Sequence, residues 1–227
     1  MAYRQTERVR QRLAARHDAI IAAARRLASE QGMGAVQIAP VAERAGIAAG
    51  TVYRYFPSKT ALVEALVAAV AEMELAAIRA TADAAPGPLS GLAAAIVTFA
   101  ARAVRQRRLS WAVMAEPVDA DIDQARLAFR KALAAEMETR LAAAAATGHL
   151  TDIDCSLAAP ALVGALLEGL VGPLAPHGAT DAARSREAVQ MLGLLALRGV
   201  GIVDARARGL IVQCLWPAAD EQHPDAV

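Results

Sequence analysis

Gly46 separates two short apolar segments, and this arrangement constrains the fold more than any other feature of the sequence. The segment before it runs from about residue 38 to 45, and the segment after it runs from about residue 48 to 56. In the longer segment 14–31, apolar side chains recur at helical spacing and predict a preceding helix. Two short helices joined at a glycine, after one longer helix, form the minimal plan of a helix-turn-helix, which we expect at about residues 37–56.

Further helices follow, divided by proline and glycine. The interruption Ala85-Pro86-Gly87-Pro88 is the clearest of these divisions. Alanine and leucine, both strong helix formers, supply much of the 56% hydrophobic content, and no convincing strand appears. Residues 209–216 are short, apolar and ambiguous. We therefore expect an all-α protein with further helices from Lys59 to the low eighties and at about 89–106, 109–115, 119–146, 153–174 and 181–200.

Charge is distributed unevenly along the chain. Residues 1–60 carry ten basic and four acidic side chains, whereas residues 61–227 carry fourteen and nineteen. This asymmetry indicates a cationic module that meets a polyanion and a mildly acidic module that does not, although a chance excess of solvated arginine is the alternative. We expect a DNA-binding domain at 1–57 with a basic arm at 1–12, a helical domain at 58–217 and a polar tail at 218–227.

The second short helix carries residues suited to DNA contact. Val52 and Phe56 are four positions apart and are expected to point inward. The opposite face presents Ala49, Gly50, Tyr53 and Arg54, with Thr51 and Tyr55 at its flanks. Small side chains at its start allow a close approach to base edges, and Arg54 is suited to guanine or a phosphate, with a solvated side chain as the alternative. Lys59 adds a charge beside the exposed amides of the next helix.

The run from Gly46 to Leu62 reads Gly-Ile-Ala-Ala-Gly-Thr-Val-Tyr-Arg-Tyr-Phe-Pro-Ser-Lys-Thr-Ala-Leu. It resembles the signature of the tetracycline-repressor (TetR) family, and the resemblance extends over about residues 13–67. The resemblance implies a two-domain α-helical repressor that works as a homodimer. In such a protein the first three helices bind double-stranded DNA, and the remainder binds an effector and dimerises.

Residue by residue, the resemblance also implies roles in the DNA-binding segment. Phosphate contacts fall to Tyr53, Tyr55 and Lys59, and positions at or near base edges to Ala49, Gly50, Thr51 and Arg54. Gln37 stands where the family commonly has a threonine that caps the second helix and touches a phosphate. Ala48 replaces a frequent serine and offers no hydroxyl. The resemblance therefore leaves the contact at this corner in doubt.

In the remainder of the chain, the resemblance implies that the helices at 153–174 and 181–200 form the dimer interface. The candidate interface residues are small or apolar: Leu162, Gly164, Ala165, Leu166, Gly169, Leu170 and Leu195. Packing within the chain's own core is the alternative for each of them. A monomer would expose these residues as a large apolar patch, which favours the dimer.

An effector pocket is expected between the helices at 59–83, 89–106, 109–115 and 119–146. Its candidate lining residues are the larger side chains of these helices: Met73, Phe99, Trp111, Met114, Glu116 and Phe129. A role in the core is the alternative for each. A mostly apolar pocket suits a hydrophobic or aromatic molecule. We expect such an effector to release the repressor from a palindromic operator, and control by a protein partner without a small ligand is the alternative.

Motifs of other classes of protein are absent from the sequence. There is no G-x-S-x-G, H-E-x-x-H or phosphate-binding loop and no Cys/His cluster, so we expect neither an enzyme nor a metal or other cofactor. Cys155 and Cys214 are far apart, which fits a reducing cytoplasm. Residues 157–176 have membrane-spanning length, but they contain Pro160, Pro173 and three glycines without a flanking basic cluster. We interpret them as a buried helix.

Overall fold

The computed structural model describes residues 2–116, 122–176 and 182–214, with side chains from Arg8 onward. These ranges hold ten α-helices and one short 3-10 helix and contain no strand, so the prediction of an all-α fold is confirmed. The predicted tail at 218–227 lies outside them. The helices form two compact units: residues 1–73 with 106–131, and residues 74–105 with 132–227.

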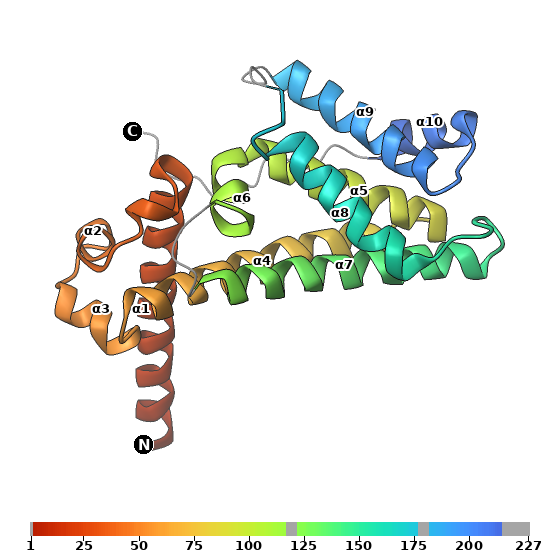
Figure 1. Ribbon diagram of the computed structural model, residues 1–227. Coiled ribbons are helices and arrows are strands. Elements are labelled where there is room, and N and C mark those ends of the chain that lie inside the picture. Colours follow the sequence, from red (N-terminus) through yellow and green to blue (C-terminus); the bar gives the residue numbers. More distant parts are fainter. Residues whose placement is uncertain (1, 117–121, 177–181, 215–227) are drawn as a thin grey trace. The chain divides into compact units, whose positions relative to one another are not determined.

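The first unit contains the predicted three-helix segment. It is built from α1 (Ala2–Gln31), the 3-10 helix (Met33–Ala35), α2 (Ile38–Arg44), α3 (Ala49–Tyr55), the first part of α4 (Lys59–Asp83), α6 (Arg107–Met114) and the start of α7 (Asp123–Ala146) (Figure 1). Ile20, Leu27 and Val41 are buried between the helices. A bidentate ion pair between Arg44 and Glu30 also joins α2 to α1, with both nitrogen–oxygen distances at 2.7 Å.

α1 begins about twelve residues earlier than the sequence pattern predicts. The pattern is governed by buried positions, and the side chains of Arg8 to Ala15 are all exposed. Arginine, glutamine, alanine and glutamate dominate residues 2–15, and all four are good helix formers. The predicted basic arm is therefore a helical extension of α1.

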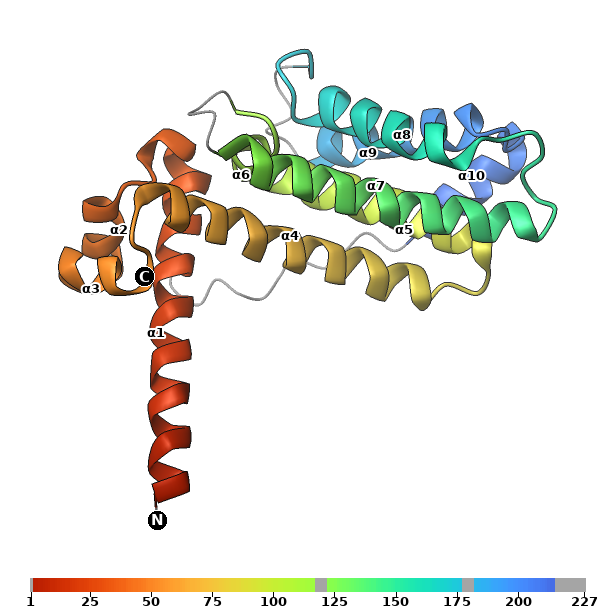
Figure 2. The ribbon, with the colours of Figure 1, turned by 60° about the horizontal axis from the view of Figure 1, so that its bottom comes forward.

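The second unit is centred on α5 (Pro88–Arg105), which packs against α8 (Cys155–Leu170), α9 (Ala182–Gly199) and α10 (Asp204–Gln213) (Figure 2). Pro88 opens α5, at a position where a missing amide hydrogen costs little. Gly193 lets α9 approach α10 closely, because a β-carbon there would lie 2.8 Å from Cδ1 of Ile211. The segment at 209–216, ambiguous in sequence, lies largely within α10, which begins at Asp204.

Ion pairs reinforce this unit from the inside. Arg102 on α5 contacts Glu74 on α4 with an Nε–Oε2 distance of 2.7 Å, and both side chains are largely buried. On the α4–α7 side, Glu136 accepts bonds from Arg79 and Arg140 at 2.8 Å. Buried pairs of this kind fix the register of neighbouring helices, because separating them would leave a charge without a partner.

Two segments have a composition that raises the question of a membrane. α5 is long and apolar enough to cross one, but 72% of it is buried inside the protein, as in the core helix of a water-soluble fold. The stretch singled out by sequence, 157–176, is not one continuous helix, because α8 ends at Leu170 and is followed by turns. α8 has sixteen residues, fewer than the roughly twenty that a membrane span requires.

Candidate nucleic-acid interface and ligand cleft

The turn between α2 and α3 is built around Gly46. This residue has a φ of +65°, in the left-handed region where a β-carbon is strained. The amides of Gly46 and Ile47 donate to the carbonyls of Glu43 and Ala42, which ends α2 and redirects the chain. Both the break at Gly46 and the second helix beyond it agree with the sequence prediction.

Two side chains of the α3 segment pack into the first unit, and most of the others face outward. Val52 and Phe56 are buried, as predicted. The Phe56 ring lies against His17 of α1, with ring centroids 5.1 Å apart. Gly50, Tyr53 and Arg54 are exposed, whereas Ala49, Thr51 and Tyr55 are half-buried at the edges of this face. Their contacts with DNA remain predictions, and their placement leaves the outward face free to make them.

The two helix starts depart from the usual side-chain capping. Gln37 occupies the N-cap position of α2, but its side-chain amide donates to the carbonyl of Gly34 at 3.0 Å instead of capping the helix. Ala48 is the N-cap residue of α3 and has no polar group to offer. At the start of α4, Ser58 accepts the amide of Ala61 at 3.0 Å, beside the half-buried Lys59.

Glu116 has a role that the sequence pattern did not reveal. Its Oε2 accepts the backbone amide of Met33 at 2.8 Å, at the junction between α1 and α2. Gly32 makes this approach possible, because a β-carbon there would lie 2.9 Å from Oε1 of Glu116. The buried Arg126 then holds the end of α6 by donating to the carbonyls of Ala112 and Glu116. No short motif signals this contact, since it joins residues 83 positions apart.

The six residues expected to line an effector pocket have other environments. Phe99, Met114 and Phe129 are packed in the core, with at most 3% of their surface exposed. The sulfur of Met73 accepts a bond from Arg25 at 3.3 Å, and Glu116 is engaged with Met33. Trp111 is half-buried on α6. None of the six lines the cleft described next, and their role in an effector pocket stays a prediction.

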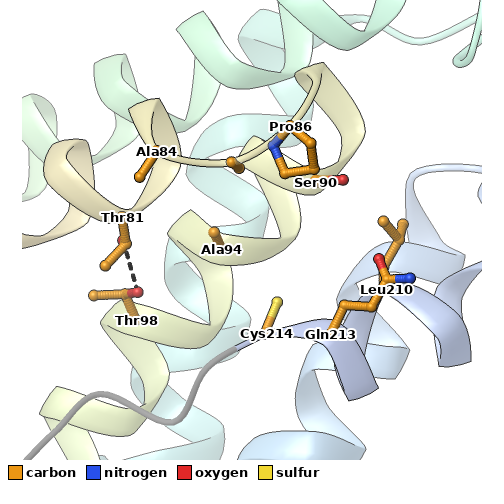
Figure 3. Close-up of a pocket in the computed structure, with 10 residues that line it drawn as sticks. Thr81, Ala84, Pro86, Ser90, Ala94, Thr98, Leu210, Gln213 and Cys214 are labelled. Carbon is orange, nitrogen blue, oxygen red and sulfur yellow. Dashed lines mark hydrogen bonds between the residues drawn. The ribbon is translucent and has the colours of Figure 1, made fainter.

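A cleft of about 530 Å³ lies in the second unit, where the end of α4 and the start of α5 meet α10 (Figure 3). Its walls are mostly small or apolar, because alanines and a proline stand where larger side chains would fill the space. The Oγ1 atoms of Thr81 and Thr98 are 2.8 Å apart at one side. Cys214 closes the other side, and burial raises the pKa of its thiol to about 11. The lining residues are Thr81, Ala84, Ala85, Pro86, Ser90, Ala94, Thr98, Leu210, Gln213 and Cys214, none of them charged.

The expected dimer residues fall into two groups. Leu162, Leu166 and Leu170 are buried in the chain's own core, and Gly169 allows close packing of α8 on Leu192 of α9. The three leucines are therefore removed from the surface available to a partner, whereas Gly169 is half-buried. Gly164, Ala165 and Leu195 are exposed. They lie on α8 and α9 with two further exposed apolar residues, Leu157 and Met191, which have 70% and 63% of their surface accessible.

Comparisons with known proteins agree with this geometry. Residues 20–66 match the family model for bacterial regulatory proteins of the tetR family. Over 48 residues the chain is 54% identical to the HTH-type transcriptional repressor KstR of Rhodococcus jostii (strain RHA1), which is 21% of this chain and 23% of that protein. KstR of Mycolicibacterium smegmatis is 52% identical over the same length, 24% of its own chain. The matched part therefore spans less than a quarter of each of these curated relatives.

Solved structures resemble the chain over a much greater length. RolR in complex with resorcinol has a TM-score of 0.66 at 22% identity, covering 92% of this chain and 99% of that one. FadR from Bacillus subtilis in complex with stearoyl-CoA has a TM-score of 0.65 at 20% identity, covering 77% and 96%. At these identities the likeness establishes the fold. Residues 20–66, which build the helix-turn-helix, are thus similar to the tetR family of bacterial regulatory proteins, and the chain as a whole shares the fold of these solved structures.

Proposed function

We propose that this protein is a homodimeric transcriptional repressor that binds a palindromic operator through α3 and leaves it when a small molecule binds. The outward face of α3 is the observation that carries the proposal. It combines a glycine, an exposed tyrosine and an exposed arginine within the cationic region 1–60. A small residue lets a helix approach base edges, and arginine pairs with guanine or phosphate. The same residues lie within 20–66, the part of the chain that matches the family model for bacterial regulatory proteins.

The dimer is proposed to form through α8 and α9. Leu157, Met191 and Leu195 are exposed there as large apolar side chains, and a monomer gains nothing from exposing them. Gly164 has open space where its β-carbon would be, so a partner helix can approach α8 closely at this point. A two-fold dimer would present two α3 helices to successive major grooves, whose spacing on DNA is roughly 34–36 Å.

The effector site is proposed to be the cleft between α4, α5 and α10. Its uncharged lining favours a neutral, mostly apolar molecule, and its size suits a ligand of one or two rings. The thiol of Cys214 stays protonated at neutral pH because its pKa is about 11, so it adds no charge. α4 runs without a break from Lys59, beside α3, to Asp83, beside the cleft. A ligand that favours one placement of this helix would therefore alter operator binding.

A second candidate is a repressor controlled by a protein partner with no small inducer. The burial of Phe99, Met114 and Phe129 favours this reading, because each has at most 3% of its surface exposed and so packs against the protein's own residues. Filling the cleft with an Ala94→Leu substitution separates the two candidates. Under ligand control the variant still binds the operator but is no longer released from it by the small molecule. Under partner control the protein partner releases the variant from the operator as it releases the wild type.

DNA binding itself is tested by selecting duplexes from a random library with the purified protein and measuring affinity by fluorescence anisotropy. Arg54→Ala is expected to weaken binding to the selected site and to relax the preference at one base pair. The expected loss of binding free energy is about 1–3 kcal/mol. Lys59→Ala is expected to weaken all sequences equally, since a phosphate contact carries no sequence information. Arg206→Ala removes the same charge from an exposed site on α10 and serves as the control. Selection that enriches no sequence would contradict the proposal.

A further inference from the structure

α1 extends well beyond the body of the helix-turn-helix. From Ile20 onward one face of the helix is buried against its neighbours, while every side chain from Arg8 to Ala15 is exposed. The ribbon shows this N-terminal part projecting past α2 and α3 in both views (Figure 1 and Figure 2). A helix that packs on nothing gains little stability from its exposed turns. The extension is therefore a candidate for contact with a binding partner.

Between the extension and α3 lies a groove of about 500 Å³. On the α1 side it is lined by Val9, Arg12, Leu13 and Arg16, which fall on one helical stripe at spacings of three and four. On the other side it is lined by the α3 segment, including Thr51 and Arg54. The stripe continues the face that Ile20 and Leu27 bury higher up the same helix. The extension and the α3 segment thus form two walls of one groove.

The charge of this groove has a single sign. Arg12, Arg16 and Arg54 all line it, and no carboxylate does. Among the described residues, none of the three forms an ion pair with Asp or Glu. Three cations around one groove repel each other, and an anion between them would relieve that repulsion. Thr51 adds a hydroxyl donor, and the half-exposed Val9 and Leu13 add apolar surface of the kind that packs against a sugar ring.

We propose that this groove holds the sugar–phosphate backbone of the operator strand that flanks the bases facing α3, with Arg12 and Arg16 neutralising its phosphates. This inference rests on the proposed function, because it assumes that α3 faces DNA. It adds a second contact surface, outside residues 20–66 that match the family model. The extension widens the DNA footprint and strengthens binding to every sequence, because phosphate contacts do not read bases.

The test is the salt dependence of operator affinity, measured by anisotropy over a series of NaCl concentrations. Each phosphate contact contributes about 0.9 to the slope of log K against log salt, so the double variant Arg12→Ala/Arg16→Ala, which removes four contacts from a dimer, should make the slope shallower by about 3–4. Arg8→Ala/Arg10→Ala removes equal charge from the same extension outside the groove, and its slope should stay close to that of the wild type. Alanine preserves the helix in both variants.

Arg12→Lys/Arg16→Lys keeps both charges and should retain most of the wild-type slope. Equal slopes for the groove variant and the Arg8/Arg10 control would overturn the inference while leaving the proposed function intact. A wild-type protein that selects no duplex would instead overturn the proposed function. A groove variant that changes the oligomeric state in light scattering, with an unchanged slope, would identify the groove as a contact between protein copies and would also overturn the inference.

Discussion

α3 and α5 are both amphipathic in sequence, yet they use their side chains in opposite ways. α3 buries only Val52 among its seven residues, so most of its side chains are available to a partner. α5 buries 13 of its 18 residues, so nearly all of its side chains are committed to packing. Substitutions on α3 should therefore change recognition and leave stability intact. Substitutions on α5 should do the reverse.

The largest expected effect is the loss of a core side chain from α5. Phe99→Ala removes a ring that is 2% exposed, and we expect the free energy of unfolding to fall by about 3–5 kcal/mol. Tyr53→Ala removes an aromatic side chain of similar size from α3, where it is 53% exposed, and should cost less than about 1 kcal/mol. Guanidinium denaturation measures both. A small cost for Phe99→Ala would contradict a role for this ring in the core and would favour its predicted role in an effector pocket.

The next effect concerns α8 and α9, which combine a buried and an exposed face. Leu195 is 60% exposed on α9, and an aspartate there would place a charge inside the proposed dimer interface. We expect Leu195→Asp to weaken dimerisation by about 2 kcal/mol or more, roughly thirtyfold in the dissociation constant. Sedimentation or light scattering across a dilution series detects the change. Leu127→Asp, at an exposed position on α7, is the control and should leave the dimer unchanged.

A smaller effect is expected where α6 meets the end of α1. Glu116→Ala deprives the buried amide of Met33 of its acceptor, and an unsatisfied buried group costs about 1–3 kcal/mol. Hydrogen exchange at that amide should accelerate by about 5–150-fold, the same free energy expressed as a rate. Glu116→Gln keeps an oxygen acceptor and should preserve most of the protection. Unchanged exchange in the alanine variant would show that the contact contributes nothing to the α1–α2 junction.

Sequence alone predicted the parts of the molecule that depend on neighbouring residues. Gly46, Val52 and Phe56 follow helical spacing and turn chemistry, so both the turn and the inward face of α3 could be read directly. The helical extension of α1 was missed because its exposed turns carry no apolar period to mark them. The predicted helix at 153–174 is longer than α8, because α8 ends just before Gly172 and Pro173 in a stretch that stays apolar.

The candidate sites that involve distant residues could not be predicted. Glu116 looked like a ligand contact because it follows Trp111 and Met114, but its partner is an amide 83 positions away. Leu162, Leu166 and Leu170 looked like interface residues because every face of α8 is apolar. Only the packing of α8 shows which face turns inward. The cleft at Cys214 exists because small side chains leave space between the helices, and such residues form no motif in the sequence.

The smallest expected effect is the pH response of one helix cap. Asp154 precedes α8 and accepts the amides of Ser156 and Leu157 at 2.9 and 3.2 Å and the Ser156 hydroxyl at 2.7 Å. These bonds, the hydroxyl above all, hold the pKa of the carboxyl below its usual 3.8. A lowered pKa in the folded state stabilises the protein above the unfolded value, and that contribution is lost as the pH falls through the folded value.

Asp154→Asn isolates this contribution from the other carboxyl groups, which titrate in both proteins. Asparagine keeps an oxygen that accepts the two amides, so α8 should retain its start. It lacks the charge, so the variant should be slightly less stable than the wild type at pH 7. The two should converge as the pH falls below the ordinary aspartate pKa and through the lower pKa of the folded state. Thermal unfolding of the two proteins between pH 7 and pH 3 measures the difference. A constant difference across that range would show that the cap acts through its oxygen alone and that its charge stabilises nothing.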